Sequence, residues 1–227
     1  TTVESVDIPK RVLHNEKIYL VTAIDTSAFE ECSAMASVTI PSSVAAIGSS
    51  AFKNCSSLTR VSIPNSVTII RNSTFYGCSS LKTVVMSDNV NAFENYAFYE
   101  CSSLSSVTMP ASLTYIGYVA FYRCKAHTVI NFPAKLETID TYAFYECTSL
   151  TSINIPAKVK TIGDNAFYGC TKLASVYVNN STPFTLGTSV FGNNASGRKI
   201  YVPSAAVSAY KSATNWSSYS GYIVAKS

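Results

Sequence analysis

Seven cysteines recur at a strict interval of 23 residues, and this period restricts the fold more than any other feature of the chain. They are Cys32, Cys55, Cys78, Cys101, Cys124, Cys147 and Cys170. A phenylalanine stands three residues before each cysteine, and a proline column follows at Pro41, Pro64, Pro110, Pro133 and Pro156, with Ser87 in the one missing place. A period of roughly 20 to 50 residues is typical of a solenoid, in which each repeat forms one coil and neighbouring coils share a core.

The repeated unit is L-x-x-V-x-I-P-x-x-V-x-x-I-G-x-x-A-F-x-x-C-x-x. Its V-x-I segment alternates with a period of two and is β-branched, which predicts a short strand with Val and Ile turned inward. The following proline cannot donate to a strand ladder and ends the strand. The x-x-A-F segment predicts one short helical or 3₁₀ turn on the opposite side.

Nine V-x-I segments therefore predict a repeat solenoid that is mostly β. We expect a curved, right-handed stack of coils with one parallel sheet of about nine short strands. The expected strands are 6–8, 38–40, 61–63, 84–86, 107–109, 130–132, 153–155, 176–178 and 200–202.

The two ends depart from the repeat, as solenoid ends do when they cover an exposed core. We expect one domain, 1–227, with an N-terminal capping coil over 1–31, regular coils over 32–178, and an irregular last coil with a C-terminal cap over 179–227. Inside the first segment, VLHNEKIYLV predicts a hairpin that turns between His14 and Lys17. In the tail, Val207, Tyr210 and Trp216 stand at roughly helical spacing and predict the closing cap.

Charge and hydropathy exclude several classes of function. Charged residues make up 13% of the chain, and the 17 basic residues are scattered without a run that could track a phosphate backbone, so we expect no nucleic-acid binding. No apolar run approaches the ~18 residues of a membrane span, so no membrane insertion is expected. The opening TTVESVDIP lacks the features of a signal peptide, and for an exported protein we expect the signal to have been removed.

The cysteine column does not predict a metal or a set of disulfides. A zinc site needs about four converging ligands, often in close C-x₂-C pairs, and the chain has no such pair. In-register neighbours lie ~4.8 Å apart with parallel side-chain vectors, which fits a bridge poorly. We expect a buried ladder of small apolar thiols and no cofactor.

A tyrosine row is one candidate binding surface. Each of its members follows a buried phenylalanine and should point outward: Tyr76, Tyr99, Tyr122, Tyr145 and Tyr168. Tyrosine offers a rigid apolar face with a polar tip, which suits sugar rings or protein partners. The alternative is that the rings only shield the coil edge by stacking on one another.

The outward positions of the strands are a second candidate. They run from small hydroxyl residues to larger groups toward the C-terminal end, where Asn131, Asn154, Tyr177 and Tyr201 stand. Solenoids commonly bind along such a face, so we favour that end for a ligand. The alternative is a solvated Ser/Thr ladder without a ligand.

Catalysis is not expected. The chain has only two histidines, and neither His14 nor His127 lies in a nucleophile motif, which argues against Ser-His-Asp and Cys-His machinery. His127 occupies the leucine slot of its coil, where a tolerated packing defect is the simplest interpretation.

The unit I-P-x-S-V-x-x-I-G-x-x-A-F-x-x-C-x-x-L-x-x-V, best seen in IPSSVAAIGSSAFKNCSSL at 40–58, resembles the BspA-like leucine-rich repeat family of bacterial surface proteins. The resemblance covers essentially the whole chain and implies a repeat solenoid of the α/β-type leucine-rich repeat class, mostly β. It implies a secreted or surface-tethered module without enzyme activity, and for some members adhesion to host matrix proteins or cells. We therefore expect a monomeric binding module whose partner is a protein or a glycan; the alternative is a spacer within a longer surface protein.

Overall fold

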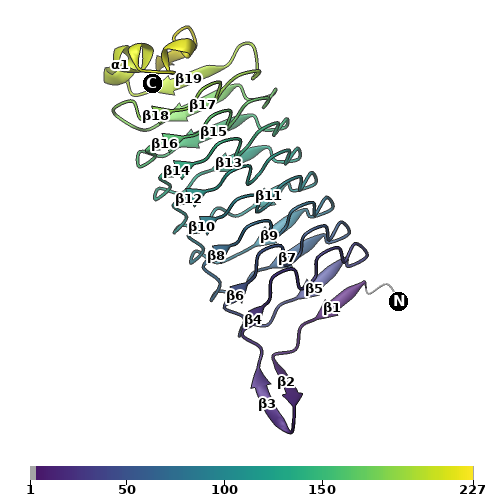
Figure 1. The fold of residues 1–227 in the computed structure, drawn as a ribbon. Coiled ribbons are helices and arrows are strands. Elements are labelled where there is room, and N and C mark those ends of the chain that lie inside the picture. The colour runs from purple at the N-terminus through teal and green to yellow at the C-terminus, as the bar shows by residue number, and fades with distance from the viewer. Residues whose placement is uncertain (1–3, 227) are drawn as a thin grey trace.

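The computed structural model describes residues 4–226, whose coils stack into an elongated solenoid (Figure 1). Nine of its strands are the predicted ones and lie along one face. They are β1 (Ser5–Asp7), β5 (Ser37–Thr39), β7 (Arg60–Ser62), β9 (Thr83–Val85), β11 (Ser106–Val107), β13 (Val129–Asn131), β15 (Ser152–Ile155), β17 (Ser175–Val178) and β19 (Lys199–Val202). The predicted solenoid and its parallel strands are confirmed.

This face differs from the expected single sheet, because it is divided into two sheets of five strands. The first runs from β1 to β11; the second runs from β13 to β19 and ends on an additional strand, β20 (Ile223–Ala225). The interruption falls just before β13, where His127 replaces the leucine of its coil and is buried with its Nδ1 atom unpaired. In the column of this slot, the His127 imidazole stands between Leu104 and Leu150 of the neighbouring coils.

A second line of strands was not predicted. Each is two residues long and lies in the V-x-x-I-G part of the unit: β4 (Ala23–Ile24), β6 (Ala46–Ile47), β8 (Ile69–Ile70), β10 (Ala92–Phe93), β12 (Tyr115–Ile116), β14 (Thr138–Ile139), β16 (Thr161–Ile162) and β18 (Thr185–Leu186). All pair in parallel, as β4 with β6 and as a six-stranded sheet from β8 to β18. Two residues are too few to produce a recognisable alternation, so the sequence pattern hides them.

The segment around each phenylalanine forms turns instead of the expected helical turn. In every coil from Phe29 to Phe191, the residues two before and two after the phenylalanine have positive φ, as Ser50 (56°) and Asn54 (59°) do beside Phe52. This left-handed backbone directs alternate N–H groups toward the next coil, so that Phe52 N–H donates to the Thr74 carbonyl at 3.0 Å. A helix would keep these donors within its own coil.

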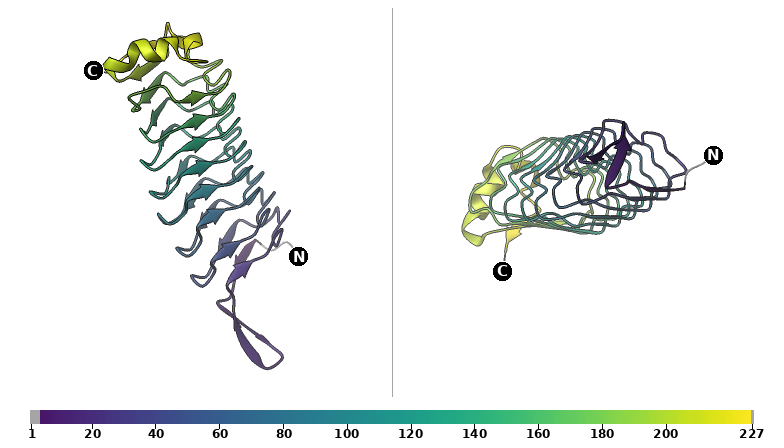
Figure 2. Two further views of the ribbon diagram at one scale, coloured as in Figure 1. Left: turned by 60° about the vertical axis from the view of Figure 1, so that its left-hand side comes forward. Right: turned by 90° about the horizontal axis from the view of Figure 1, so that it is seen from below.

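Successive coils overlie one another (Figure 2, right), and their strands pair in register, so the core is a set of columns of equivalent residues. The phenylalanine rings from Phe29 to Phe191 stack with centroids 4.9–6.0 Å apart. The seven cysteines are free, and all are buried except Cys32, which is exposed at the first coil. The expected thiol ladder is therefore present over six coils.

The N-terminal hairpin is present but does not cover the core as expected. Strands β2 (Arg11–His14) and β3 (Lys17–Leu20) pair antiparallel around the predicted turn, and the hairpin projects away from the coils (Figure 1). Its apolar side chains face solvent, with Leu13 73% and Ile18 67% exposed. Successive residues of each strand point to opposite faces of the two-stranded ribbon, so apolar side chains lie on both faces. Neither face packs against the first coil.

The C-terminal tail covers the last coil (Figure 1). It consists of η1 (Ser204–Ala206), α1 (Val207–Ser212), η2 (Ser217–Tyr219) and strand β20. Tyr210 and Trp216 are fully buried, and the Trp216 indole N–H donates to the Phe184 carbonyl at 3.0 Å. The Tyr219 hydroxyl accepts the Phe191 N–H at 3.1 Å, which ends the ladder of N–H groups that point out of each coil.

Within residues 4–226, no helix has both the length and the apolar character needed to cross a membrane.

Candidate functional site

Four of the candidate residues lie together on the outer side of strands β13 to β19. In the parallel register, Asn131 stands beside Asn154, Asn154 beside Tyr177, and Tyr177 beside Tyr201. Their neighbours Ile130, Ile153 and Val176 are buried, because successive residues of a strand point to opposite faces. We call this surface the strand-face site: Asn131, Asn154, Tyr177, Asn179, Tyr201 and Lys226.

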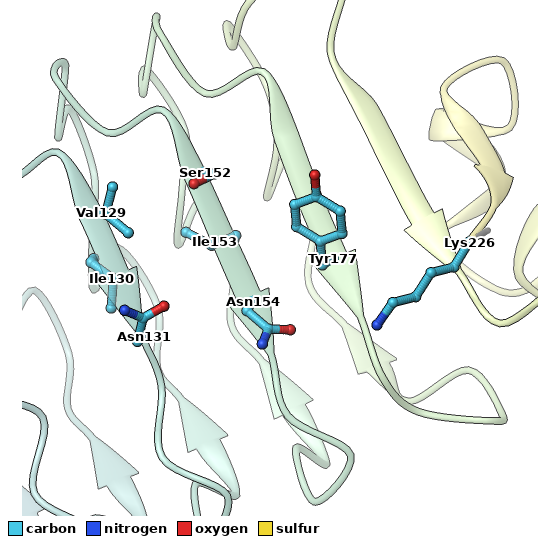
Figure 3. Close-up of a pocket in the computed structure, with 8 residues that line it drawn as sticks. All are labelled: Val129, Ile130, Asn131, Ser152, Ile153, Asn154, Tyr177 and Lys226. Carbon is cyan, nitrogen blue, oxygen red and sulfur yellow. The ribbon is translucent and has the colours of Figure 1, made fainter.

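A chain of hydrogen bonds holds one side of the strand-face site. The Lys226 ammonium donates to the Asn179 side-chain oxygen at 2.8 Å, and the Asn179 amide donates to the Asn154 side-chain oxygen at 2.8 Å. Figure 3 shows Lys226, which follows β20 on the far side of β19, extending toward Asn154 and Tyr177. Each asparagine amide carries two N–H donors. The Asn154 amino group has no partner among the described residues and faces solvent.

An aromatic pair forms the other side of the strand-face site. The Tyr177 and Tyr201 rings are parallel within 10°, with centroids 4.8 Å apart. Between β13, β15 and β17 the surface contains a hollow of about 320 Å³, lined by Asn131, Asn154, Tyr177 and Lys226 among others (Figure 3). This volume is at the lower end of ligand pockets, which span roughly 300–1,000 Å³. The arrangement offers amide hydrogen bonds, one cation and an aromatic surface to a polar ligand.

The tyrosine row lies on another part of the coils. Each of its members directly follows the phenylalanine of a turn, and none of them lines this hollow. Its rings stack from coil to coil with centroids 4.5–5.4 Å apart, in the order Tyr76, Tyr99, Tyr122, Tyr145 and Tyr168. Both ends of the row are covered. The Lys53 ammonium stands 5.8 Å from the centre of the Tyr76 ring, and a Cβ atom at Gly192 would lie 2.6 Å from the Tyr168 ring. Because the rings stack on one another with an offset, much of each ring face is already in contact with a neighbouring tyrosine.

A second group of tyrosines that the sequence reasoning missed lies against this row. Tyr96, Tyr118 and Tyr142 meet one another edge to face at 5.5 and 6.2 Å. Together with the row they surround a hollow of about 450 Å³ whose lining includes Val119. Val119 has a φ of 50°, which is unusual for a β-branched residue. The group escaped notice because Tyr118 stands three residues before its phenylalanine while the other two stand two residues before theirs.

The phenol group of Tyr99, in the middle of the row, remains a hydrogen-bond donor over the physiological range. Partial burial and the neighbouring Glu100 raise the pKa of Tyr99 to about 12, so the hydroxyl stays protonated. Arg123 crosses the row, donating to Glu146 at 2.8 Å with its guanidinium carbon 5.1 Å from the centre of the Tyr122 ring. The row presents ring edges and hydroxyls, which suits hydrogen bonding better than stacking of a ligand.

Six of the seven cysteines and His127 are buried in the core. Residues 4–226 contain no cluster of three His, Cys, Asp or Glu side chains placed to hold a metal ion. Burial raises the pKa of the Cys55 thiol to about 12 and lifts the pKa of the Cys78 thiol well above its ordinary value, so these thiols are not nucleophiles. His127 is buried, and desolvation lowers its pKa, which keeps the imidazole neutral.

Two members of the strand-face site were not anticipated. Asn179 follows the strand β17, and Lys226 follows β20, a strand that pairs with β19 although it lies outside the 23-residue repeat. The repeat pattern carries no signal for Lys226. The side chain reaches the site only because the tail returns along the sheet after covering the last coil.

These coils, each with a strand, a two-residue strand and a phenylalanine turn around a leucine-lined core, define a leucine-rich repeat solenoid. The model of the BspA type leucine-rich repeat region, in six copies, matches residues 5–128 and 114–219. The chain belongs to this family.

Two solved structures are similar over most of the chain. A leucine-rich repeat protein from Bacteroides ovatus is 28% identical with a TM-score of 0.62, covering 87% of this chain and 63% of its own. The leucine-rich repeat protein of T. pallidum is 26% identical with a TM-score of 0.57, covering 85% of this chain and 77% of its own. This chain thus spans less than two thirds of the Bacteroides ovatus protein. No curated protein matches it.

Proposed function

We propose that the protein is a non-catalytic binding or adhesion module, secreted or displayed on a cell surface, that recognises a protein or a glycan through its repeat surface. The observation that carries the proposal is the strand-face site. There, Asn131, Asn154 and Tyr177 from three consecutive strands line one hollow on the exposed face of the solenoid. Side chains repeated along neighbouring strands can make many polar contacts with one partner, each of them weak. Solenoids bind partners in this way along their extended surfaces.

The strand-face site supports recognition better than the tyrosine row does. In the row, each ring is engaged with its neighbours and both ends are covered. In the strand-face site, Asn131 and Asn154 are exposed and the Tyr177–Tyr201 pair is half-buried. Exposed amides beside an aromatic surface remain free to pair with a partner.

A surface location is consistent with the family and with the composition. Charged residues make up only 13% of the chain, and the strand face is populated by Ser, Thr, Asn and Tyr.

The alternative function is that of a spacer, in which the repeats only separate other parts of a longer surface protein.

A binding screen distinguishes these two functions. The purified domain is tested against immobilised matrix proteins and a glycan array, next to the double variant Asn154→Ala/Tyr177→Ala. The matched control is Thr39→Ala/Ser62→Ala, which truncates outward residues of the same face at the other end of the solenoid. The binding module is supported by at least one partner whose signal falls tenfold or more in the first variant only. Absence of any partner favours the spacer.

A further inference from the structure

The distribution of charge along the chain is uneven. After Asp164 the chain contains no acidic residue, whereas it contains five basic ones: Lys172, Arg198, Lys199, Lys211 and Lys226. The preceding 164 residues carry twelve basic and thirteen acidic side chains. The positive charge of the protein is therefore concentrated at the C-terminal end of the solenoid, where the strand-face site lies.

Two of these five cations border the aromatic pair of the strand-face site. Lys199 opens β19, is exposed, and stands two residues before Tyr201, so both side chains point to the outer face. Lys226 lines the hollow and is bonded to Asn179. Arg198 is not available to a ligand, because it is buried with its guanidinium 4.0 Å from the centre of the Tyr222 ring.

No carboxylate of the described strands neutralises these lysines. Strands β13, β15, β17, β19 and β20 contain no Asp or Glu. None of the four ion pairs found among the described residues includes Lys199 or Lys226. A positive surface without internal counter-charges attracts an anionic ligand, and the attraction weakens as salt is added.

The remaining chemistry of the strand-face site is polar and aromatic. Asn131 and Asn154 offer amide donors and acceptors, and the Tyr177–Tyr201 pair offers a flat surface with two hydroxyls. Val129 is the one exposed large apolar residue in the lining of the hollow. Protein interfaces usually have an apolar core, whereas this surface suits a ligand with rings and many hydroxyl groups.

We infer that the strand-face site binds an acidic polysaccharide, with Lys199 and Lys226 pairing with its anionic groups and Asn154 and Tyr177 contacting its sugar rings and hydroxyls. This inference rests on the proposed function and narrows it to one class of partner. The hollow between β13 and β17 holds one part of the chain of sugars, and the flat face along the strands accommodates the rest.

The test uses two forms of one polysaccharide, polygalacturonate and its fully methyl-esterified form, which share a backbone and differ in charge. We expect the purified protein to bind the acidic form at least tenfold more tightly, with an affinity that falls as salt rises from about 50 to 500 mM. Lys199→Ala/Lys226→Ala and Tyr177→Ala should each weaken binding at least fivefold while the thermal unfolding midpoint is retained.

The matched control is Lys125→Ala/Lys211→Ala, which removes the same charge from a turn and from α1. Equal losses in both lysine variants would show non-specific charge attraction and would overturn the inference. Equal binding of the two polysaccharides, or binding of an acidic protein instead of either, would also overturn it while leaving the proposed binding function in place. If neither polysaccharide binds, the inference fails, and the screen of matrix proteins separately decides the proposed function.

Discussion

The Cys78 thiol donates a hydrogen bond to the carbonyl oxygen of Phe52, with 3.0 Å between Sγ and oxygen. The same bond joins each buried cysteine to the phenylalanine of the preceding coil, at 3.0–3.2 Å for Cys55, Cys78, Cys101, Cys124, Cys147 and Cys170. The cysteine column therefore links neighbouring coils through thiol–carbonyl hydrogen bonds, with all seven thiols free of disulfides. It also explains why a thiol stands at this place, since it is small, apolar and still able to satisfy a carbonyl.

Alkylation should separate the cysteines into one reactive and six protected residues. Cys32 has no coil before it and is exposed, whereas the other six are buried. We expect iodoacetamide to modify Cys32 alone in the native protein and all seven after denaturation, as measured by peptide mass spectrometry. Modification of several cysteines in the native state, or intact masses that reveal disulfides, would contradict the ladder.

Acid should weaken the solenoid through His127. Burial lowers its pKa below the value of about 6.5 for an unfolded histidine, so the unfolded chain binds the proton more readily. The contribution of neutral His127 to stability is present above pH 6.5 and is lost as the pH falls below it. Denaturant unfolding between pH 7.5 and 5 should show this loss, with a slope of at most about 1.4 kcal/mol per pH unit.

The variant His127→Leu restores the residue found at this slot in neighbouring coils. It should remove the dependence of the unfolding free energy on pH between pH 7.5 and 5. His14→Gln is the control, because His14 is exposed in β2 and its replacement should leave the dependence unchanged. An unchanged pH profile in His127→Leu would rule out this account. Below about pH 4.5, protonation of Glu30 and Glu137, whose pKa values are lowered by Lys53 and Lys160, adds a separate loss.

Removal of the hairpin should leave the solenoid nearly as stable as before. The Val21 N–H donates to the Lys10 carbonyl at 3.0 Å at its base, and the same bond can close a β-turn if Arg11–Leu20 is replaced by Asn-Gly. Because the hairpin side chains are exposed, the free energy of unfolding should change by less than about 0.5 kcal/mol. A loss greater than about 2 kcal/mol in urea unfolding would show that the hairpin covers the core after all.

The C-terminal cap should depend on the Tyr210 hydroxyl. This group is buried within 2.9 Å of the Thr182 carbonyl and 3.2 Å of the Asn180 carbonyl. Tyr210→Phe leaves these acceptors without their donor and should cost about 1–2 kcal/mol of unfolding free energy. Tyr118→Phe, at a residue that is 36% exposed, should cost less than about 0.5 kcal/mol. Equal losses of unfolding free energy in the two variants, measured by urea unfolding, would contradict a stabilising role of the buried Tyr210 hydroxyl.

Sequence reasoning predicted the parts of the fold that repeat. The column of apolar residues in V-x-I marks nine strands, and Phe and Cys mark the core, because each position has the same surroundings in every coil. It did not predict the left-handed turns at residues such as Ser50 and Asn54, since their conformation depends on hydrogen bonds to a neighbouring coil. It also failed at the hairpin, where alternation predicts strands but does not say what they cover.

The candidate site was partly predictable for the same reason. Asn131, Asn154, Tyr177 and Tyr201 occupy one repeat column, and a column in sequence becomes a row in space. Lys226 could not be found, because its position depends on the path of the tail through α1 and β20. The edge-to-face group of Tyr96, Tyr118 and Tyr142 departs from the 23-residue register and carries no periodic signal.

Hydroxyl-radical footprinting of the protein with its bound partner tests the central claim most directly, because oxidation reports the exposure of individual tyrosines. If the strand-face site is the binding surface, the partner should reduce the oxidation of Tyr177 and Tyr201 at least threefold and leave Tyr99 and Tyr122 unchanged. Protection of Tyr99 and Tyr122 with Tyr177 and Tyr201 unaffected would contradict the account and assign recognition to the tyrosine row.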